Sequence, residues 1–240
     1  MKMIFSNPVW VTAPTKVSIL SEDVHIWRIS LDRPKIELQD LRKTLSEDEI
    51  ARAERFYFEE HRQNFIAGRG ILRKILSQYL NIQPQQVQFS YEAKGKPVLA
   101  DKFCMSKISF NLSHSQGLAL CAISCVRSIG VDLEYMRPME VESLSERFFS
   151  VREHEFICSL PPSERQEIFF RYWTCKEAYL KATGAGLTQL ENIELSLAPE
   201  QPAKIISDED WCLFELLPAD NFLSAVAVAG SGLNIKYWQY

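Results

Sequence analysis

Nothing in the 240-residue sequence approaches the run of ~18 apolar residues that a membrane-spanning helix needs, so we expect no membrane partner. The first eight residues lack the extended apolar core of a secretory signal peptide. The six cysteines include no Cys-x-x-Cys pair, which favours free thiols in the cytoplasm over a zinc site or a disulfide framework. A net charge of −4 argues against general nucleic-acid binding. We therefore expect a cytoplasmic protein that binds neither membranes nor nucleic acids.

The composition is that of an ordinary globular protein. Hydrophobic residues make up 46% of the chain and charged residues 24%, which is enough apolar surface for a sizeable core. A length of 240 residues suits one large domain or two modest ones. The choice between these two depends on the order of the strand and helix signals.

The first half of the chain mixes strand and helix signals. Residues 17–31 contain many β-branched residues and predict one or two strands. Ser46 and Glu49 form a capping box that opens a long helical stretch, which either is continuous or breaks near Gly68 or Gly70. Further strand signals lie at residues 87–91 and 118–126.

The second half repeats this arrangement in looser form. Ser150 and Glu153 form another capping box, and a longer helix follows that ends at Gly184. Four strand signals complete this half, at residues 193–197, 211–217, 222–229 and 233–238. We therefore predict an α+β protein of two similar halves, residues 1–127 and 128–240, although no close sequence repeat is visible.

Four charged residues suggest a chemical site. Asp132 and Glu134 are two apart on a predicted strand and point to the same face. Glu177 and Lys181 are four apart on the later helix and share one of its faces. Three carboxylates of this kind could hold Mg²⁺ against a phosphate, with a lysine nearby for the charge. Each pair alone also fits a simpler interpretation, a solvated strand face or an exposed ion pair.

Five short segments occur in a specific order along the chain: residues 95–97 (Gly-Lys-Pro), 110–115 (Phe-Asn-Leu-Ser-His-Ser), 130–134 (Gly-Val-Asp-Leu-Glu), 148–150 (Phe-Phe-Ser) and 173–181 (Trp-Thr-Cys-Lys-Glu-Ala-Tyr-Leu-Lys). In this order they resemble the 4′-phosphopantetheinyl transferases, and more narrowly the surfactin-synthetase-activating type. The resemblance implies two pseudo-twofold-related halves, each a small antiparallel sheet packed with helices. It covers residues from about 46 to about 190.

The resemblance also implies an activity. Members of this family move the 4′-phosphopantetheine arm of coenzyme A onto a serine of an apo acyl or peptidyl carrier protein, and 3′,5′-ADP leaves. The reaction depends on Mg²⁺, with Mn²⁺ as an alternative because both accept hard oxygen ligands. The carriers belong to fatty-acid, polyketide or nonribosomal-peptide synthesis, so a role in secondary metabolite biosynthesis follows. A monomer is expected, because two halves in one chain can build the cleft.

Residue roles follow from the same resemblance. Asp132, Glu134 and Glu177 would face the metal, Glu177 would be the catalytic base, and Lys181 would neutralise the pyrophosphate or the leaving group. The N-terminal half would hold the adenine and the 3′-phosphate, and the C-terminal half the metal. The predicted coenzyme A contacts are Arg52, Arg62, Arg69, Lys96, Pro97, Ser113, His114 and Lys181.

Some of these roles have alternatives at the level of sequence. Lys96 and Pro97 also fit a plain surface turn. Glu49 stands where some relatives carry a lysine, so the arginine that meets the 3′-phosphate stays open. Residues 148–160 form either a carrier-docking patch or a core-packing helix. The other three histidines, at positions 25, 61 and 154, are expected to be structural.

Two other functions use the same residues. The chain could be a carrier-binding module without catalysis, which the presence of all three acids and the lysine disfavours. It could also be a metal-dependent phosphohydrolase that acts on nucleotides. That class is disfavoured because the sequence has no recognisable nucleophile and no Gly-x-x-x-x-Gly-Lys-Ser/Thr phosphate loop.

Overall fold

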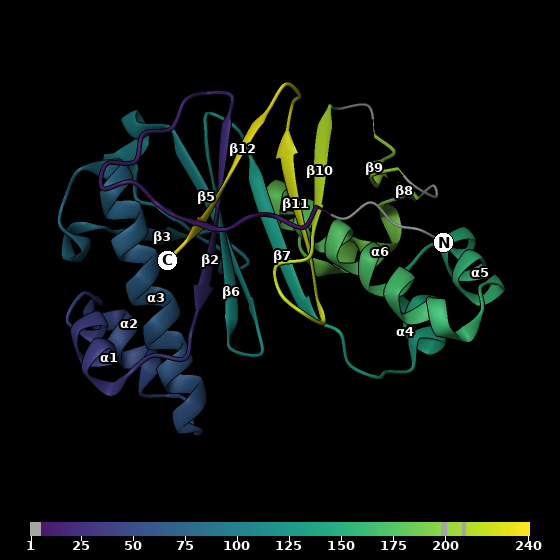
Figure 1. Ribbon diagram of the computed structural model, residues 1–240, viewed down its shortest axis with the longest axis horizontal. Coiled ribbons are helices and arrows are strands. Elements are labelled where there is room, and N and C mark those ends of the chain that lie inside the picture. The colour runs from purple at the N-terminus through teal and green to yellow at the C-terminus, as the bar shows by residue number, and fades with distance from the viewer. Residues whose placement is uncertain (1–5, 198–200, 208–209) are drawn as a thin grey trace.

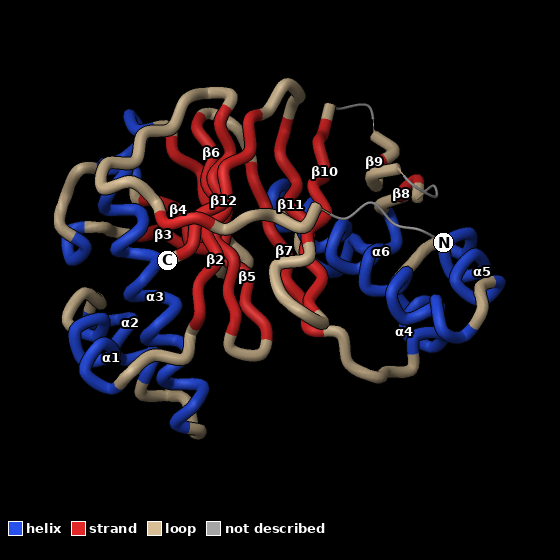
Figure 2. The backbone as a smooth tube through the Cα atoms, in the orientation of Figure 1, coloured by secondary structure: helices blue, strands red, loops and turns tan. Residues whose placement is uncertain are grey.

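Two β-sheets lie side by side in the computed structural model, with helices on their outer sides (Figures 1 and 2). The structure describes residues 6–197, 201–207 and 210–240. The first sheet has the order β1-β12-β2-β6-β5 and the second the order β10-β11-β7. Two short hairpins, β3–β4 and β8–β9, complete the strands of the described part of the chain.

The larger sheet belongs mainly to the N-terminal half. Its strands are β1 (Val11–Thr12), β12 (Asn234–Gln239), β2 (Asp23–Ser30), β6 (Leu118–Cys125) and β5 (Ile108–Ser115). The other elements of this half are α1 (Lys35–Arg42), α2 (Glu47–Ala53), α3 (Glu59–Leu80), η1 (Pro84–Gln86), β3 (Phe89–Tyr91), β4 (Pro97–Leu99) and η2 (Asp101–Ser106). Strands β2, β6 and β5 are antiparallel, and β12 and β1 add two parallel strands at the edge next to β2.

The smaller sheet is antiparallel and belongs to the C-terminal half. Its strands are β10 (Trp211–Leu216), β11 (Phe222–Ala229) and β7 (Ile129–Tyr135). The other elements of this half are α4 (Val141–Phe148), α5 (Val151–Ser159), α6 (Pro162–Thr183), η3 (Leu187–Asn192), β8 (Leu195–Ser196) and β9 (Lys204–Ile205).

Both halves use the same order of elements. Each has a strand, two short helices, a helix of 22 residues, a 3-10 turn, a short hairpin and two long strands. The three main strands also pair in the same order, β2-β6-β5 in one half and β7-β11-β10 in the other. The predicted α+β fold of two similar halves is therefore confirmed, and the repeat that the sequence hides is visible in the topology.

One buried ion pair occurs at matching places in the two halves. Glu49, the third helical residue of the capping box that opens α2, accepts a hydrogen bond of 2.7 Å from Arg73 on α3. Glu153, at the same place in α5, accepts one from Lys176 on α6. Each cation also donates to a backbone carbonyl near the following 3-10 turn, at 2.7 Å in the N-terminal half and 3.1 Å in the other. Because these charges are buried, removal of one partner would leave the other uncompensated.

The two ends of the described chain cross between the halves. Ser6 bridges to Leu216 of β10, which lies in the smaller sheet. Strand β12, near the C-terminus, pairs instead with β2 in the larger sheet (Figure 1). The division of the chain between residues 127 and 128 stays a prediction. By sequence β12 belongs to the C-terminal half, but it pairs with β2 of the N-terminal half.

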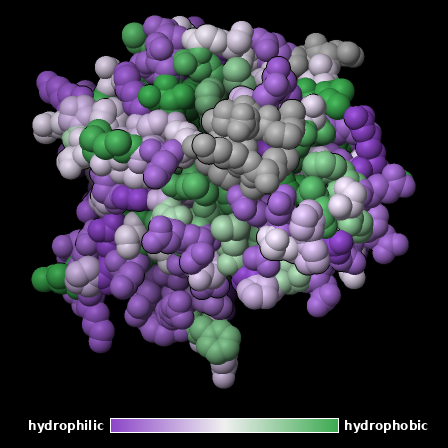
Figure 3. All heavy atoms as spheres, turned by 45° about the vertical axis from the view of Figure 1, so that its right-hand side comes forward, coloured by the Kyte–Doolittle hydropathy of each residue, from purple (hydrophilic) through white to green (hydrophobic). Residues whose placement is uncertain are grey.

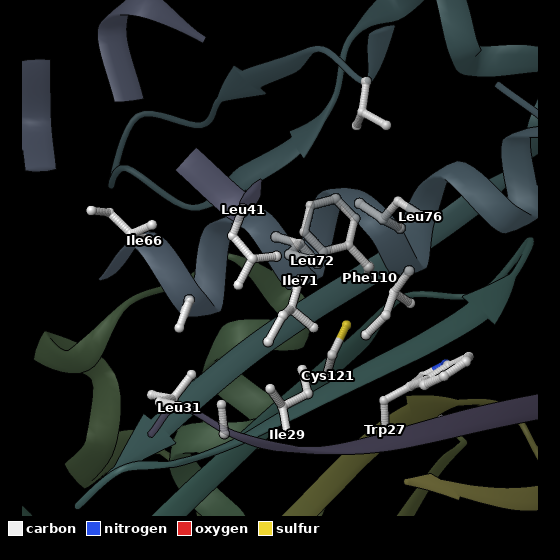
Figure 4. Close-up of a cluster of buried hydrophobic side chains, with 14 of the residues drawn as sticks. Trp27, Ile29, Leu31, Leu41, Ile66, Ile71, Leu72, Leu76, Phe110 and Cys121 are labelled. Carbon is white, nitrogen blue, oxygen red and sulfur yellow. The ribbon is translucent and has the colours of Figure 1, made fainter. Parts of the chain in front are cut away.

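Three apolar clusters hold these layers together. Figure 4 shows the first, in which α3 packs on the larger sheet through residues such as Ile71 and Leu72 against Ile29. A second cluster packs α6 against the smaller sheet. The third lies between the sheets and joins Ile26 and Leu120 of one half to residues of β7 and β11 in the other. Each fully buried side chain of this kind contributes roughly 1.5–3 kcal/mol, so the third cluster fixes the two halves relative to each other.

Figure 3 shows a face on which hydrophobic residues gather in separate groups among hydrophilic ones. None of the described helices is long and apolar enough to cross a membrane.

Candidate active site

The halves meet where β5 runs along the free edge of β7. Asparagine and serine side chains at alternate positions of β5 accept hydrogen bonds from backbone N–H groups of β7. The pairs are Asn111 with Val131 at 2.9 Å, Ser113 with Leu133 at 3.3 Å, and Ser115 with Tyr135 at 3.2 Å. An edge strand needs partners for its N–H groups, and this polar face of β5 supplies them. The intervening residues of β5, Leu112 and His114, therefore point the other way.

Asp132 of β7 lies at the centre of the charged residues. It is buried, and its Oδ1 accepts hydrogen bonds from Lys181 Nζ at 2.6 Å and from Ser113 Oγ at 3.1 Å. Lys181 Nζ also lies 3.2 Å from Ser113 Oγ. The second carboxylate oxygen of Asp132, Oδ2, is buried without a hydrogen-bond partner among the described residues. An unpartnered buried carboxylate oxygen is costly, which indicates a ligand or a water at this position.

Glu134 and Glu177 both have raised pKa values. Burial and the negative charge of Asp132 raise the pKa of each carboxyl to about 7, although Lys181 acts in the opposite direction on both. Trp173 donates a hydrogen bond to Glu134, which also opposes the rise in its pKa. Three acids thus stand near one lysine, and the mutual repulsion of the acids makes a further positive charge favourable here.

The donor set fits a hard divalent cation. Among the described residues, no group of three or more His, Cys, Asp or Glu side chains is close enough to hold a metal ion on its own. Mg²⁺ does not need such a cage, because it usually keeps waters and takes one or two carboxylates together with substrate phosphates. The free Oδ2 of Asp132 and the raised pKa values of Glu134 and Glu177 are the observations that fit this mode.

A cavity of about 440 Å³ lies against this group of charges. Glu177 and Lys181 form its wall on the side of α6, and the turn of the β3–β4 hairpin forms the opposite wall. Gly95 has a positive φ of 81°, a conformation that favours glycine, and it gives the hairpin its tight turn. Asn111 and Leu112 of β5 also line this cavity.

A second cavity, of about 590 Å³, adjoins the first. The two share three lining residues, Gly95, Pro97 and Leu112, so they form one groove across the molecule. The lining of the second cavity is mainly basic and aromatic, with one acid, Glu60. Its basic and aromatic members come from α2, the α2–α3 connection, α3 and β5: Arg52, Phe56, His61, Phe65, Arg69 and His114. The first end of the groove therefore carries acids and lysines together, Glu92 and Glu177 with Lys94, Lys96 and Lys181, whereas the second end is mainly basic.

Arg69 is the buried cation of the second cavity. It lies 3.5 Å from Glu49 Oε1, its guanidinium stacks over the ring of Phe89, and its Nη1 has no hydrogen-bond partner among the described residues. Desolvation by burial lowers the pKa of Arg69, and the charge of Glu49 opposes this. A buried guanidinium with an open N–H is well suited to bind a phosphate.

The other two predicted arginines differ from Arg69. Arg52 lines the same cavity, is exposed, and stacks over Phe65. Arg62 does not line either cavity and instead pairs with Glu54 at 3.3 Å and Glu59 at 2.6 Å. The structure thus brings Arg52 and Arg69 into the groove and leaves Arg62 outside it.

The remaining predicted contacts occupy different positions. Ser113 is buried under Lys181, whereas His114 lines the second cavity, where partial desolvation and the charge of Lys181 lower its pKa. Lys96 and Pro97 line the first cavity, and Lys96 Nζ donates to the backbone carbonyl of Lys181. His61 was expected to be structural, yet it lines the second cavity. Its place on α3 four residues before Phe65, which lines the same cavity, was the available signal.

A groove with lysines beside Glu177 at one end and two arginines at the other has the charges that suit a phosphate-rich ligand. Comparisons with known proteins make this specific. Residues 128–227 match the family model of the 4′-phosphopantetheinyl transferase superfamily, and residues 23–126 match that of the N-terminal part of a 4′-phosphopantetheinyl transferase.

Individual relatives agree with the family models. The chain is 58% identical to the 4′-phosphopantetheinyl transferase HetI of Nostoc sp. strain PCC 7120, over 96% of this chain and 98% of that protein. It is 35% identical to a putative 4′-phosphopantetheinyl transferase of Synechocystis sp. strain PCC 6803, over 89% of this chain and 84% of that protein. It is 28% identical to the transferase Sfp of Bacillus subtilis, over 68% of this chain and 71% of that protein. The chain belongs to the 4′-phosphopantetheinyl transferase family of enzymes, as its motifs predicted.

Proposed function

We propose that the protein transfers the 4′-phosphopantetheine arm of coenzyme A to a serine of an apo acyl or peptidyl carrier protein. The observation that carries this proposal is the groove, which joins Glu177 and Lys181 at one end to Arg69 at the other. Coenzyme A has a pyrophosphate and a 3′-phosphate at two ends of one nucleotide, and the groove offers charge for both. Membership of the transferase family supports the same ligand.

The proposed reaction is an in-line transfer at phosphorus. The carrier serine Oγ forms a bond to the β-phosphorus of coenzyme A while the bond to the bridging oxygen breaks, and 3′,5′-ADP leaves with the electron pair. The serine proton passes to Glu177, directly or through a water. With a pKa of about 7, this carboxylate can accept a proton near neutral pH. Lys181 offsets charge on the pyrophosphate or the leaving group.

Asp132, Glu134 and Glu177 are the residues that would hold a metal ion. Mg²⁺, or Mn²⁺ in its place, supplies neutralisation of the phosphate oxygens when bound. Asp132 has one oxygen engaged with Lys181 and one open, which suits a residue that binds a cation and a lysine together. Ser113 Oγ lies within hydrogen-bond distance of both Asp132 Oδ1 and Lys181 Nζ.

The far end of the groove would hold the adenine and the 3′-phosphate. Arg69, with its open Nη1, is the better candidate for the phosphate, and Arg52 and His114 lie on the same cavity. Pro97 and the aliphatic stem of Lys96 would form the wall beside the adenine. Arg62 is the least suited of the predicted arginines, because Glu54 and Glu59 already neutralise it.

We further propose that the protein acts as a cytoplasmic monomer. Both ends of the groove come from a single chain, so a second copy is not needed to complete the site. Fatty-acid, polyketide and nonribosomal-peptide carriers are all candidate partners, and the 148–160 segment with its exposed Val151 is a candidate docking surface.

The test is to incubate the protein with coenzyme A, Mg²⁺ and an apo-carrier, and to measure the mass of the carrier. A gain of one phosphopantetheine supports the proposal. No gain across carriers of all three kinds contradicts it, and carrier binding without a gain would instead support the non-catalytic module. Cleavage of coenzyme A in the absence of a carrier would support the phosphohydrolase.

A further inference from the structure

The end of α6 is held by the other half of the molecule. Helix ends leave their last carbonyls without partners, and a backbone N–H beyond the helix often supplies one. Asn81 does this at the end of α3, where its N–H donates to Ser77. In the described part of the chain no such bond closes α6, and the N–H of Ala185 lies 3.4 Å from Thr183 Oγ1 instead.

Thr183 Oγ1 donates to the carbonyls of Tyr179 and Leu180, and two lysines of the β3–β4 hairpin bind the carbonyls that follow. Lys96 Nζ donates to the carbonyl of Lys181, in the last turn of α6, and Lys94 Nζ donates to the carbonyl of Ala185 just beyond the helix. A positive charge at the C-terminal end of a helix is favourable. The contact is close, because a Cβ added at Gly186 would meet the Lys94 side chain at 2.5 Å.

Lys181 connects this cap to the acid cluster. Its carbonyl accepts the hydrogen bond from Lys96, and its own ammonium donates to Asp132 Oδ1. One turn before it on the same helix is Glu177, the proposed base. Two hydrogen bonds in series therefore join the β3–β4 hairpin to α6 and α6 to Asp132 of β7.

We propose that Lys96 and Lys94 are positioning residues, which act through the C-terminal turn of α6 to hold Lys181 and Glu177 in place. The stem of Lys96 lines the groove while its ammonium binds the helix, so it does not serve as a contact of the 3′-phosphate. This inference rests on the proposed transferase function, and it changes the role predicted for Lys96.

The test compares Lys96→Met with coenzyme A and with dephospho-coenzyme A, which lacks the 3′-phosphate. A positioning role predicts that kcat falls about ten- to a hundredfold, since small misplacement of catalytic groups has effects of this size. The loss should be equal for the two substrates. Loss of a 3′-phosphate contact would instead raise KM for coenzyme A alone, and that result would overturn the proposal.

Further variants separate positioning from general loss of structure. Lys96→Arg keeps a donor and should recover most of the kcat. Lys94→Met, which loosens the outer bond, should give a smaller loss than Lys96→Met. Lys35→Met is the matched control, because Lys35 is an exposed lysine on α1 away from the groove. Equal losses in Lys35→Met and Lys96→Met would contradict the proposal.

Amide hydrogen exchange tests the cap without the reaction. Residues 178–186 should exchange faster in Lys96→Met than in Lys35→Met, with no coenzyme A present. Unchanged exchange in this segment would overturn the cap. A wild-type protein that protects this segment as described but transfers nothing would overturn the proposed function and leave the cap standing.

Discussion

Lys181 Nζ on α6 lies 2.6 Å from Asp132 Oδ1 on β7. This ion pair joins the two motifs that the sequence singled out, and it is partly buried, with 5% of the Asp132 side chain exposed. Removal of one partner from such a pair leaves the other charge unpaired in a poorly solvated site. The pair therefore links stability and chemistry in one contact.

Replacement of Lys181 tests this link. Lys181→Met should lower kcat by about a hundredfold or more, because an electrostatic donor to the phosphates is lost. Lys181 also lowers the pKa values of Glu134 and Glu177, so its loss should move the acidic limb of the pH–rate profile to higher pH. The profile of kcat/KM from pH 5.5 to 9 measures both effects. An unshifted acidic limb would speak against the placement of this charge.

The pH dependence of stability follows from the two raised pKa values. The carboxyls of Glu134 and Glu177 have pKa values of about 7 in the folded protein and ordinary values near 4.5 when unfolded. The folded state thus binds more protons between pH 4.5 and 7, and stability from these groups falls as the pH rises through that window. Mg²⁺ or Mn²⁺ should oppose the fall, so the metal should raise the Tm by several degrees more at pH 8 than at pH 5.5.

The control for this measurement is the double variant Glu134→Gln and Glu177→Gln. It should abolish most of the pH dependence and most of the increase in Tm that the metal produces. A metal effect of equal size at both pH values, or one that survives in the double variant, would place the cation elsewhere.

The arginines can be ranked by one pair of substrates. Arg69→Met should raise KM for coenzyme A about ten- to a hundredfold, since a charge-assisted contact to phosphate is lost. The same variant should behave like the wild type with dephospho-coenzyme A. Arg62→Met is the matched control on the same helix, and its KM should stay within about twofold because Arg62 is neutralised at the surface. A larger effect for Arg62→Met than for Arg69→Met would reverse the assignment.

Two glycines test how closely the long helices α3 and α6 pack against their neighbouring segments. A Cβ at Gly130 of β7 would lie 2.0 Å from the carbonyl oxygen of Ala178 on α6, so Gly130→Ala must displace the helix that carries Glu177. We expect a loss of about 3 kcal/mol or more in the free energy of unfolding, together with loss of transfer. Gly68→Ala on α3 would meet only Leu31 at 3.5 Å and should gain up to about 1 kcal/mol. Chemical denaturation measures both values, and similar stabilities of the two variants would contradict the packing described.

Much of the fold follows from local sequence signals. The capping boxes at Ser46 and Ser150 open helices as predicted, and Gly184 ends α6. The helical stretch after Ser46 was expected either to be continuous or to break near Gly68 or Gly70. It is instead interrupted at residues 54–58, and α3 is continuous through both glycines. Gly70 is explained by packing, because a Cβ there would lie 2.7 Å from that of Leu41.

Long-range pairing is the part that sequence patterns do not specify. Residues 233–238 read as a strand, but nothing local indicates that β12 joins β2 in the other half. The hairpin of β8 and β9 is short, and only part of it was expected. β12 and β2 are far apart in sequence, so tertiary packing decides their pairing.

The site shows the same division. Spacing alone placed Asp132 and Glu134 on one face and Glu177 with Lys181 on another, and the structure brings all four together. Spacing could not show that Ser113 of β5 contacts this group while His114 lines the second cavity. Both placements depend on which strand β5 runs beside.

The most direct test of phosphopantetheine transfer with Glu177 as the base is the mass of an apo-carrier after incubation with coenzyme A and Mg²⁺. The wild type and Glu177→Gln are measured in parallel. Circular dichroism and the Tm would first establish that the variant is folded. The carrier should gain one phosphopantetheine with the wild type and almost none with Glu177→Gln in the same time. Transfer at near-equal rates by both proteins, or none by the wild type with any carrier, would contradict it.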